Sequence, residues 1–381
     1  MDPINLCFES TRIVMETILT SQPDRWDAAL RQTRHDFYHL ADYHRLAEER
    51  EEGVARLYVF SQDGHTLAMP LLLRPMESLP GLGDLGAGYC DATSVYGYAG
   101  PVCSHVHVPP AIAQQFRTEL AAALTESRVV AAFSRLHPLF PEQEEILAGL
   151  GEYEKRWRTV SIDLTRSPEQ QLAVYRADHR RGIRILHQQG FEFAIDPDGR
   201  YLDVFIEIYA ETMRRLGAAP SYLFDRSYFD RLLADGRVFH LLVAMLHGEV
   251  VSGAMFALCN GICQYHLSGT RDSVRRLAPN KLILDEARVW AREQGAQVLH
   301  LGGGHGGEDS LFQFKAGFSD RRHDFATWSW VVRPRLYEEL VTAREHAGQW
   351  HGRLRGDIGF FPLYRYAGSA AVSPSPPETP V

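Results

Sequence analysis

The chain has 381 residues, of which 45% are hydrophobic and 23% charged, and its formal net charge is −8. At about 150 residues per domain, this length predicts two or three folded units. The hydrophobic content is sufficient for their cores. The negative net charge excludes a protein that binds nucleic acid through overall basicity.

Lysine is unusually scarce in this chain. Only three of the 40 basic residues are lysines, namely Lys155, Lys281 and Lys315, and asparagine is equally rare. Because lysine and asparagine codons are rich in adenine, this bias indicates a GC-rich bacterial genome in which arginine replaces lysine. An ammonium differs from a guanidinium in shape and hydration, so each remaining lysine is a candidate for a position where arginine would not function.

The ends of the chain and its cysteines indicate a cellular compartment. Residues 1–5 do not begin a basic region followed by an apolar stretch, and no apolar run approaches the length of a membrane span. Five cysteines in a chain of this length are typical of a reduced protein. We therefore expect a cytoplasmic protein without a membrane span, and a disordered Ser/Pro/Ala-rich tail over residues 368–381.

The spacing of Cys259, Cys263 and His266 is compatible with a metal site. However, Asn260-Gly261 lies between two apolar runs and is a strong signal for a two-residue hairpin turn. The turn places the cysteines on its two flanking strands, and we predict no metal site.

An internal repeat organises the chain. A helical pattern at residues 37–50 precedes two strand patterns at 56–64 and 67–73, and a helical pattern at 201–216 precedes two strand patterns at 239–246 and 250–258. The hairpin glycines, Gly64 and Gly248, occupy equivalent places. Two similar α+β units explain the length better than one large domain. We expect these units at 1–160 and 161–335, followed by a helical extension at 336–367 and the tail at 368–381.

The second unit continues with a strand at 262–268, an arginine-rich loop, a helix at 281–294, a strand at 298–301, the glycine cluster 302–307, a short segment at 309–318 and a strand at 327–332. The glycines either form a structural turn or let backbone amides approach a ligand. Gly302, Gly304 and Gly307 match a dinucleotide fingerprint, but no strand–helix–strand unit surrounds them and no Lys-Ser/Thr follows. Both Rossmann and P-loop sites are therefore disfavoured.

Several segments together resemble the FemAB-like branch of the GNAT acyltransferase superfamily. The order of strands, loop and helix in the second unit is that of the GNAT core. The resemblance covers roughly residues 30–335 and rests on residues 96–101, 209–215, Tyr222, 265–270, 278–281, 285–287, Trp290, 300–304 and 314–318.

This resemblance implies an α+β fold of two tandem GNAT-like domains, each with a mixed, mostly antiparallel sheet flanked by helices. It also implies amide-bond formation by acyl transfer to an amine, without a bound cofactor. The preferred donor is aminoacyl-tRNA, and the acceptor is the amine of a cell-wall precursor or of a natural-product intermediate, as in antibiotic biosynthesis.

Two alternatives remain open. One is an acyl-CoA-dependent N-acyltransferase of polysaccharide or small-molecule biosynthesis. Only Gly269 precedes the loop of Arg271, Arg275 and Arg276, so the glycine pattern with which acyl-CoA enzymes hold pyrophosphate is absent. The other is a non-catalytic descendant that only binds an anionic ligand.

The resemblance assigns a donor site around the Phe314-Lys315 pair, which in tRNA-dependent members contacts the terminal ribose-phosphate and the ester. Lys315 would stabilise the tetrahedral oxyanion. The competing interpretations are a solvated lysine and a core phenylalanine. The expected donor-binding residues are Phe314, Lys315, Asn280, Arg275, Arg276, Gly303 and Gly304.

The acceptor site is expected at Arg215, for which adjacent Arg214 is an alternative, and at Tyr222, Tyr98 and Arg180. Arg180 belongs to a group in which residues 176, 180 and 184 share one helix face. This face either contacts tRNA or anionic acceptor phosphates or is a solvated helix surface.

The attacking amine must lose a proton, and the candidate general bases are His266 and Asp91. A histidine on a strand is otherwise a core residue, and Asp91 is otherwise a turn cap. Proton transfer assisted by the substrate would need neither of them.

Overall fold

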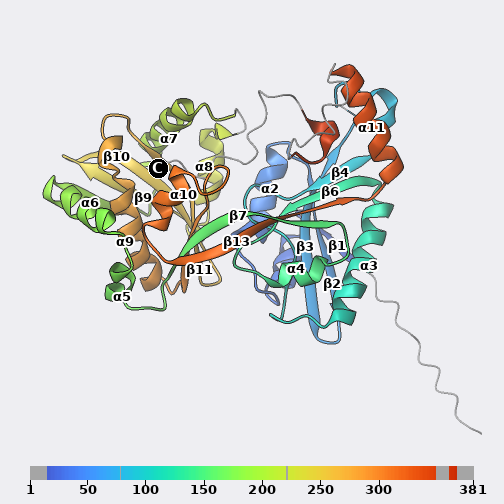
Figure 1. Cartoon of the computed structure of the whole chain (residues 1–381), viewed down its shortest axis with the longest axis horizontal. Helices are drawn as coiled ribbons and strands as arrows, with labels where there is room; N and C mark the ends of the chain where they lie inside the picture. The colour runs from blue at the N-terminus through green and yellow to red at the C-terminus, as the bar shows by residue number, and fades with distance from the viewer. Residues whose placement is uncertain (1–14, 78, 220–221, 349–359, 367–381) are drawn as a thin grey trace, which may run out of the picture.

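The computed structural model describes residues 15–77, 79–219, 222–348 and 360–366, and the predicted tail at 368–381 lies outside them. Figure 1 shows two α+β halves side by side, joined through the middle by two long strands. Their strands form a 13-stranded mixed sheet in the order β1-β2-β3-β4-β6-β13-β7-β12-β11-β10-β9-β8, with β5 beside β3. The predicted fold class is confirmed.

The elements that precede the long strand β7 make up most of the first half. They are β1 (Glu16–Leu19), α1 (Pro23–Leu30), η1 (Phe37–His39), α2 (Ala41–Glu49), β2 (Val54–Gln62), β3 (His65–Pro75), η2 (Gly83–Gly86), β4 (Cys90–Thr93), β5 (Val102–Cys103), α3 (Pro110–Glu126), β6 (Val129–Arg135) and α4 (Glu142–Leu147).

The remaining elements begin with β7 and end near the C-terminus. They are β7 (Glu152–Asp163), α5 (Pro168–Ala173), α6 (Ala177–Gln188), β8 (Phe191–Asp196), α7 (Leu202–Leu216), α8 (Arg226–Leu233), β9 (Phe239–Leu246), β10 (Glu249–Cys259), β11 (Ile262–Thr270), η4 (Arg275–Leu277), α9 (Asn280–Glu293), β12 (Val298–Gly302), α10 (Ser310–Ala316), β13 (Arg321–Val331), α11 (Pro334–Ala347) and η6 (Leu363–Arg365).

The internal repeat appears as two equivalent hairpins. The β2–β3 turn has φ angles of 49° at Asp63 and 77° at Gly64, and the β9–β10 turn has 55° at His247 and 82° at Gly248. Two successive positive φ angles are typical of the type I′ turn, whose twist matches that of paired strands. The predicted hairpin at Asn260-Gly261 is confirmed by the pairing of β10 with β11.

Strands β7 and β13 connect the halves. β13 pairs with β6 of the first half over residues 327–331 and with β7 over residues 321–329, whereas residues 160–163 of β7 pair with β12 of the second half. Helix α11 then packs against the first half, where Leu340 and Tyr364 are buried with Val130. The C-terminal elements thus return to the half in which the chain began.

One hydrophobic core cluster extends across both halves. The ring of Phe37 lies 5.0 Å from that of Phe239, and Tyr43 packs on the same ring from α2. Because buried aromatic side chains fill the junction, the relative position of the halves is set by core packing. Within the described residues, no helix combines the length and the apolar character that crossing a membrane requires.

Candidate functional site

A gap opens in the sheet between two neighbouring parallel strands. β11 and β12 pair only from Ile262–Val298 to Gln264–His300. β12 then ends at Gly302, while β11 continues to Thr270. Residues beyond the last pair therefore face a space that the sheet does not close.

A pocket with about 330 Å³ of empty space, part of it open to solvent, occupies this position. Both halves contribute to its wall: η1, the 96–98 loop and β6 from the first, and β11, β12 and α10 from the second. Its lining residues are Tyr38, Tyr96, Gly97, Tyr98, Arg135, Gln264, Tyr265, His266, Leu301, Gly302 and Lys315.

Lys315 lies at the second-half wall and is completely buried. Its Nζ donates a 2.7 Å hydrogen bond to the carbonyl of Gly303 and lies 6.0 Å from the centre of the Tyr265 ring. Burial lowers the pKa of Lys315 to about 7, against the opposing attraction of Asp309. The interpretation as a solvated lysine is wrong, and this side chain can exchange a proton near neutral pH.

The glycine cluster forms the tight turn that leads into α10. Asp309 caps this helix by accepting from the amide of Phe312 at 2.9 Å, and it also accepts from the amide of His305 at 2.7 Å. A Cβ on Gly304 would lie 2.3 Å from Asp309 Oδ1. Gly303 and Gly304 therefore shape the loop that places Lys315, and Gly302 lines the pocket.

His266 also lines the pocket, inside a group of aromatic rings. Its Nε2 lies 3.5 Å from the hydroxyl of Tyr228, and its ring packs against those of Phe37 and Tyr96. Burial lowers the pKa of His266 to about 3. The imidazole is therefore neutral at physiological pH, and it is a weak base.

Asp91, the other expected base, does not lie at this pocket. Its buried carboxylate accepts from Arg74 at 2.7 Å and from Arg365, and so it holds the C-terminal segment against β4. The structure does not bring Asp91 together with Lys315.

Of the expected acceptor-binding residues, Tyr98 lines the pocket, with its ring 5.3 Å from that of His300. Tyr222 stands behind the pocket wall, since its ring lies 6.0 Å from that of Tyr96 and its carbonyl accepts from Tyr209. Arg180 lies on exposed α6 and donates to the carbonyl of Tyr175.

Arg215 lies elsewhere, in an open surface depression that it shares with Arg275 and Arg276. This depression has about 880 Å³ of empty space, and its wall also contains Asp272, to which Arg215 donates. Arg215, which we expected to bind the acceptor, thus lies beside Arg275 and Arg276, which we expected to bind the donor. Asn280 is buried at the start of α9, where its side-chain oxygen accepts a hydrogen bond from the Ser252 hydroxyl at 3.0 Å.

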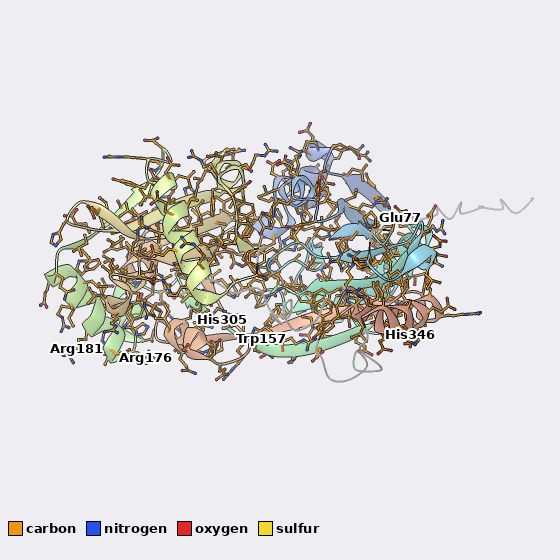
Figure 2. All side chains as sticks on the ribbon, turned by 90° about the horizontal axis from the view of Figure 1, so that it is seen from above. Glu77, Trp157, Arg176, Arg181, His305 and His346 are labelled. Carbon is orange, nitrogen blue, oxygen red and sulfur yellow. The ribbon has the colours of Figure 1, made fainter. Side chains whose placement is uncertain are left out.

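Phe314 faces away from the pocket, toward α6. Its ring lies 5.4 Å from that of His179, whose Nε2 contacts the Phe314 carbonyl at 2.9 Å. It is 9% exposed within the core of the second half. Figure 2 shows His305 of the glycine loop toward the middle of the molecule, and Arg176 and Arg181 at its outer end.

Sequence reasoning missed Arg135, at the end of β6. Its Nε donates to the carbonyl of Gly97 at 3.0 Å, and its guanidinium lies over the rings of Tyr98 and Phe325 at 5.5 and 4.8 Å. Burial lowers its pKa. In a chain so rich in arginine, no local pattern distinguishes this residue.

Gln264 was missed as well, although a polar residue on a strand buried along its whole length is a usable signal. Its Nε2 donates to Asp36 at 2.7 Å, and its Oε1 accepts from Nδ1 of His300, also at 2.7 Å. His300 Nε2 then accepts from Thr159 at 2.9 Å, and His137 contacts Asp36 at 3.0 Å. This chain of buried hydrogen bonds joins the two halves beneath the pocket.

The family described as acetyltransferase (GNAT) domain matches residues 173–316, which include β11, β12 and Lys315. A comparison with curated proteins finds no match.

Solved structures share the fold of nearly the whole chain. The crystal structure of FemX is similar with a TM-score of 0.64 and 16% identity over 85% of this chain and 99% of its own. The structure of L-PGS from Bacillus licheniformis has a TM-score of 0.52 and 13% identity, over 80% of this chain and 91% of its own. The C-terminal domain of a putative lysylphosphatidylglycerol synthetase from Agrobacterium fabrum has a TM-score of 0.52 and 14% identity, over 81% of this chain and 92% of its own. Residues 173–316 therefore match a GNAT acetyltransferase domain, and the chain shares the two-unit fold of FemX.

Proposed function

We propose that this protein is an N-acyltransferase that joins an acyl donor to an amine bound in the pocket between its halves. The observation that carries the proposal is the buried Lys315, whose pKa of about 7 allows proton exchange at the gap between β11 and β12. A buried ammonium destabilises the fold, and such perturbed groups cluster at functional sites.

The chemistry requires one group that can take and return a proton. As the amine nitrogen bonds to the donor carbonyl carbon, neutral Lys315 accepts a proton from that nitrogen. The resulting ammonium stabilises the oxyanion of the tetrahedral intermediate. When the bond from carbon to the leaving oxygen breaks, Lys315 returns the proton to that oxygen. The lysine ends as it began, and no covalent enzyme intermediate is needed.

The two other candidates suit this role less well. His266 lies at the pocket, but a base with a pKa of about 3 provides little driving force for proton abstraction near neutral pH. The carboxylate of Asp91 is held by Arg74 and Arg365. Lys315 therefore takes both the base and the oxyanion role.

The proposed donor is aminoacyl-tRNA, and the acceptor is an amine-bearing small molecule or cell-wall precursor. The Phe314-Lys315 pair of the FemAB resemblance supports this donor, although Phe314 would have to turn from the core to stack on it. Exposed basic side chains support it too, because arginine binds phosphates well. They are Arg275 and Arg276 at the open depression, Arg180, Arg181 and Arg184 on α6, and Arg176 at the N-cap of that helix.

A second donor, acyl-CoA, is favoured by one observation. The matching family description is that of an acetyltransferase domain, and the match includes the gap between the strands. With acyl-CoA the proton from Lys315 would go to the leaving sulfur, and the residue roles would otherwise be unchanged.

The decisive experiment supplies both donors to the same protein. Purified protein is incubated with a pool of amines and with intact charged tRNA, RNase-treated charged tRNA or acetyl-CoA, and new amides are sought by mass spectrometry. An RNase-sensitive product supports the tRNA donor, and a product with acetyl-CoA alone overturns it. Lys315→Ala should abolish the product, whereas Lys155→Ala, at an exposed lysine paired with Asp324, should not. No product with either donor would contradict the proposed function and favour a binding protein.

A further inference from the structure

One surface of the second half carries two leucines that are exposed to solvent. Leu216 is the last residue of α7 and is 42% exposed, and Leu277 is the last residue of η4 and is 39% exposed. Each directly follows an arginine that lines the open depression, Arg215 in one case and Arg276 in the other. Because Arg215 donates to Asp272 of the loop that leads into η4, the end of α7 is held beside that loop. The two leucines therefore border the same depression.

The fold itself leaves these leucines uncovered. Tyr209 and Met213 are buried on one stripe of α7, and Leu216 continues the spacing of this stripe beyond the core. The helix then ends at Gly217, whose φ of 62° is the left-handed conformation of a helix cap. Leu277 lies in η4, where no residue is buried. Single exposed leucines are common, but two beside the same group of arginines make an amphipathic surface.

Three arginines of this surface have no acidic partner. The side chains of Arg214, Arg275 and Arg276 are exposed and form no ion pair with any residue that the structure describes. Arg215 differs from them, because it is paired with Asp272. The positive charge of an unpaired arginine is available to an anionic partner, and a guanidinium binds a phosphate through two parallel hydrogen bonds.

The surface is basic although the chain as a whole is acidic. Two carboxylates of α7, those of Glu207 and Glu211, are held by Arg271 at 2.9 and 3.0 Å. The formal net charge of the chain is −8, so an anionic partner repels the molecule as a whole and attracts only a local group of arginines. Binding through this surface would therefore fix one orientation of the protein.

An anionic bilayer matches both properties of this surface. Lipid phosphates bind arginine, and the acyl layer directly beneath them takes up leucine side chains. RNA also offers phosphates, but it has no apolar layer for a leucine to enter. The two leucines therefore favour lipid over RNA as the partner.

We infer that the protein docks on a bilayer that contains anionic phospholipids. The docking surface consists of Arg214, Arg215, Leu216, Arg275, Arg276 and Leu277. The contact is peripheral, with the guanidinium groups at the phosphates and the two leucines at the boundary of the acyl layer. This inference concerns a partner of the protein and does not depend on the proposed reaction.

Sedimentation of the full chain with lipid vesicles tests the inference. Vesicles of phosphatidylglycerol and phosphatidylcholine should bind the wild type about tenfold more tightly than vesicles of phosphatidylcholine alone. Leu216→Ser/Leu277→Ser and Arg275→Gln/Arg276→Gln should each weaken binding to the anionic vesicles by about tenfold. Added salt should weaken binding of the wild type, because screening reduces the contribution of the arginines.

Matched controls change the same residue types in the first half. Leu19→Ser/Leu85→Ser alters two leucines that are 40% and 41% exposed. Arg31→Gln/Arg335→Gln changes the net charge as much as the arginine variant does, also at exposed positions. Both controls should bind the anionic vesicles like the wild type. Equal binding of the wild type to the two kinds of vesicle, or equal losses in controls and variants, overturns the inference.

Titration of the same proteins with tRNA, followed by fluorescence anisotropy, tests the opposing partner. Binding of tRNA that only the arginine variant weakens, without binding to anionic vesicles, assigns this surface to RNA and overturns the inference. Vesicle binding that the leucine variant loses supports it, whether or not the protein transfers an acyl group. Circular dichroism reports whether each variant is folded. If the leucine variant is not, the preference of the wild type for anionic vesicles and its loss in the arginine variant decide.

Discussion

Lys315 is a basic side chain buried at the wall of the pocket. Its hydrogen bond to Gly303 and its position beside the Tyr265 ring compensate only part of the hydration that it loses, and the remaining cost appears as a pKa of about 7. The same burial that makes the ammonium costly gives the amine a pKa suited to proton transfer near neutrality. Burial of the Lys315 side chain therefore lowers the stability of the fold while it supports the proposed activity.

We expect Lys315→Met to be more stable than the wild type below pH 7 and to lose this advantage as the pH rises. The lysine pKa is about 7 when folded and 10.5 in the ordinary reference state. Between these values the unfolded chain binds more protons, so the wild-type free energy of unfolding rises with pH. Denaturant titrations should show the advantage falling by about 3 kcal/mol from pH 6 to pH 9.

Lys155→Met is the matched control, since Lys155 is exposed and loses no hydration through burial. Its stability relative to wild type should not fall in this way between pH 6 and pH 9. An advantage of Lys315→Met that is independent of pH would contradict the assigned pKa.

Among the elements, α10 and the glycine loop before it act as one unit. The loop supplies the carbonyl that holds Lys315, and Asp309 joins the loop to the first turn of the helix. This short helix can place a buried lysine because its start is fixed by side-chain and backbone contacts on both sides of Asp309.

Gly304→Ala should disrupt this unit, because its Cβ would lie 2.3 Å from Asp309 Oδ1 and 2.5 Å from the Gly307 carbonyl. We expect a loss of about 1–3 kcal/mol in the free energy of unfolding and a larger loss of acyl transfer. The control is Gly306→Ala in the same loop, where an added Cβ meets no atom within 4 Å. Both quantities, measured by denaturation and by product formation, should be close to wild type in the control. Equal behaviour of the two variants would contradict this account of the loop.

At the scale of the molecule, the site exists only because the halves are held in one arrangement. The sheet continues through β13 and β7, and the core continues through Phe37 and Phe239. The bond from Gln264 to Asp36 adds a directional link across the junction, and the bond from His300 to Gln264 holds the other end of this amide within the second half.

Gln264→Leu removes the link but keeps the approximate volume. Asp36 and His300 each lose a partner in a buried setting, so we expect a loss of about 1–3 kcal/mol in the free energy of unfolding. Chemical denaturation would measure it, and Gln188→Leu at an exposed position of α6 should show almost none. A Gln264→Leu protein as stable as wild type would show that core packing alone holds the halves together.

Much of the fold could be predicted from the sequence because its signals are local. The hairpins at Gly64, Gly248 and Asn260-Gly261 follow from residues that tolerate positive φ, and α7, α9 and β12 follow from periodicity. The helix expected at 37–50 divides into η1 and α2, which a helical pattern alone does not reveal. Codon bias and motif together selected Lys315, and the structure places it at the pocket.

The composition of the site was decided by tertiary structure. The carboxylate of Asp91 binds arginine, and the ring of Phe314 packs in the core of the second half. Arg215 lies in the surface depression with Arg275. Arg135 lines the pocket, although it lies on a strand that contains no recognisable motif. A sequence determines which residues can form a strand, a turn or a buried face, because those preferences act between neighbours. Which faces meet depends on contacts between residues more than a hundred positions apart, and only the packing of the two halves across β7 and β13 sets them.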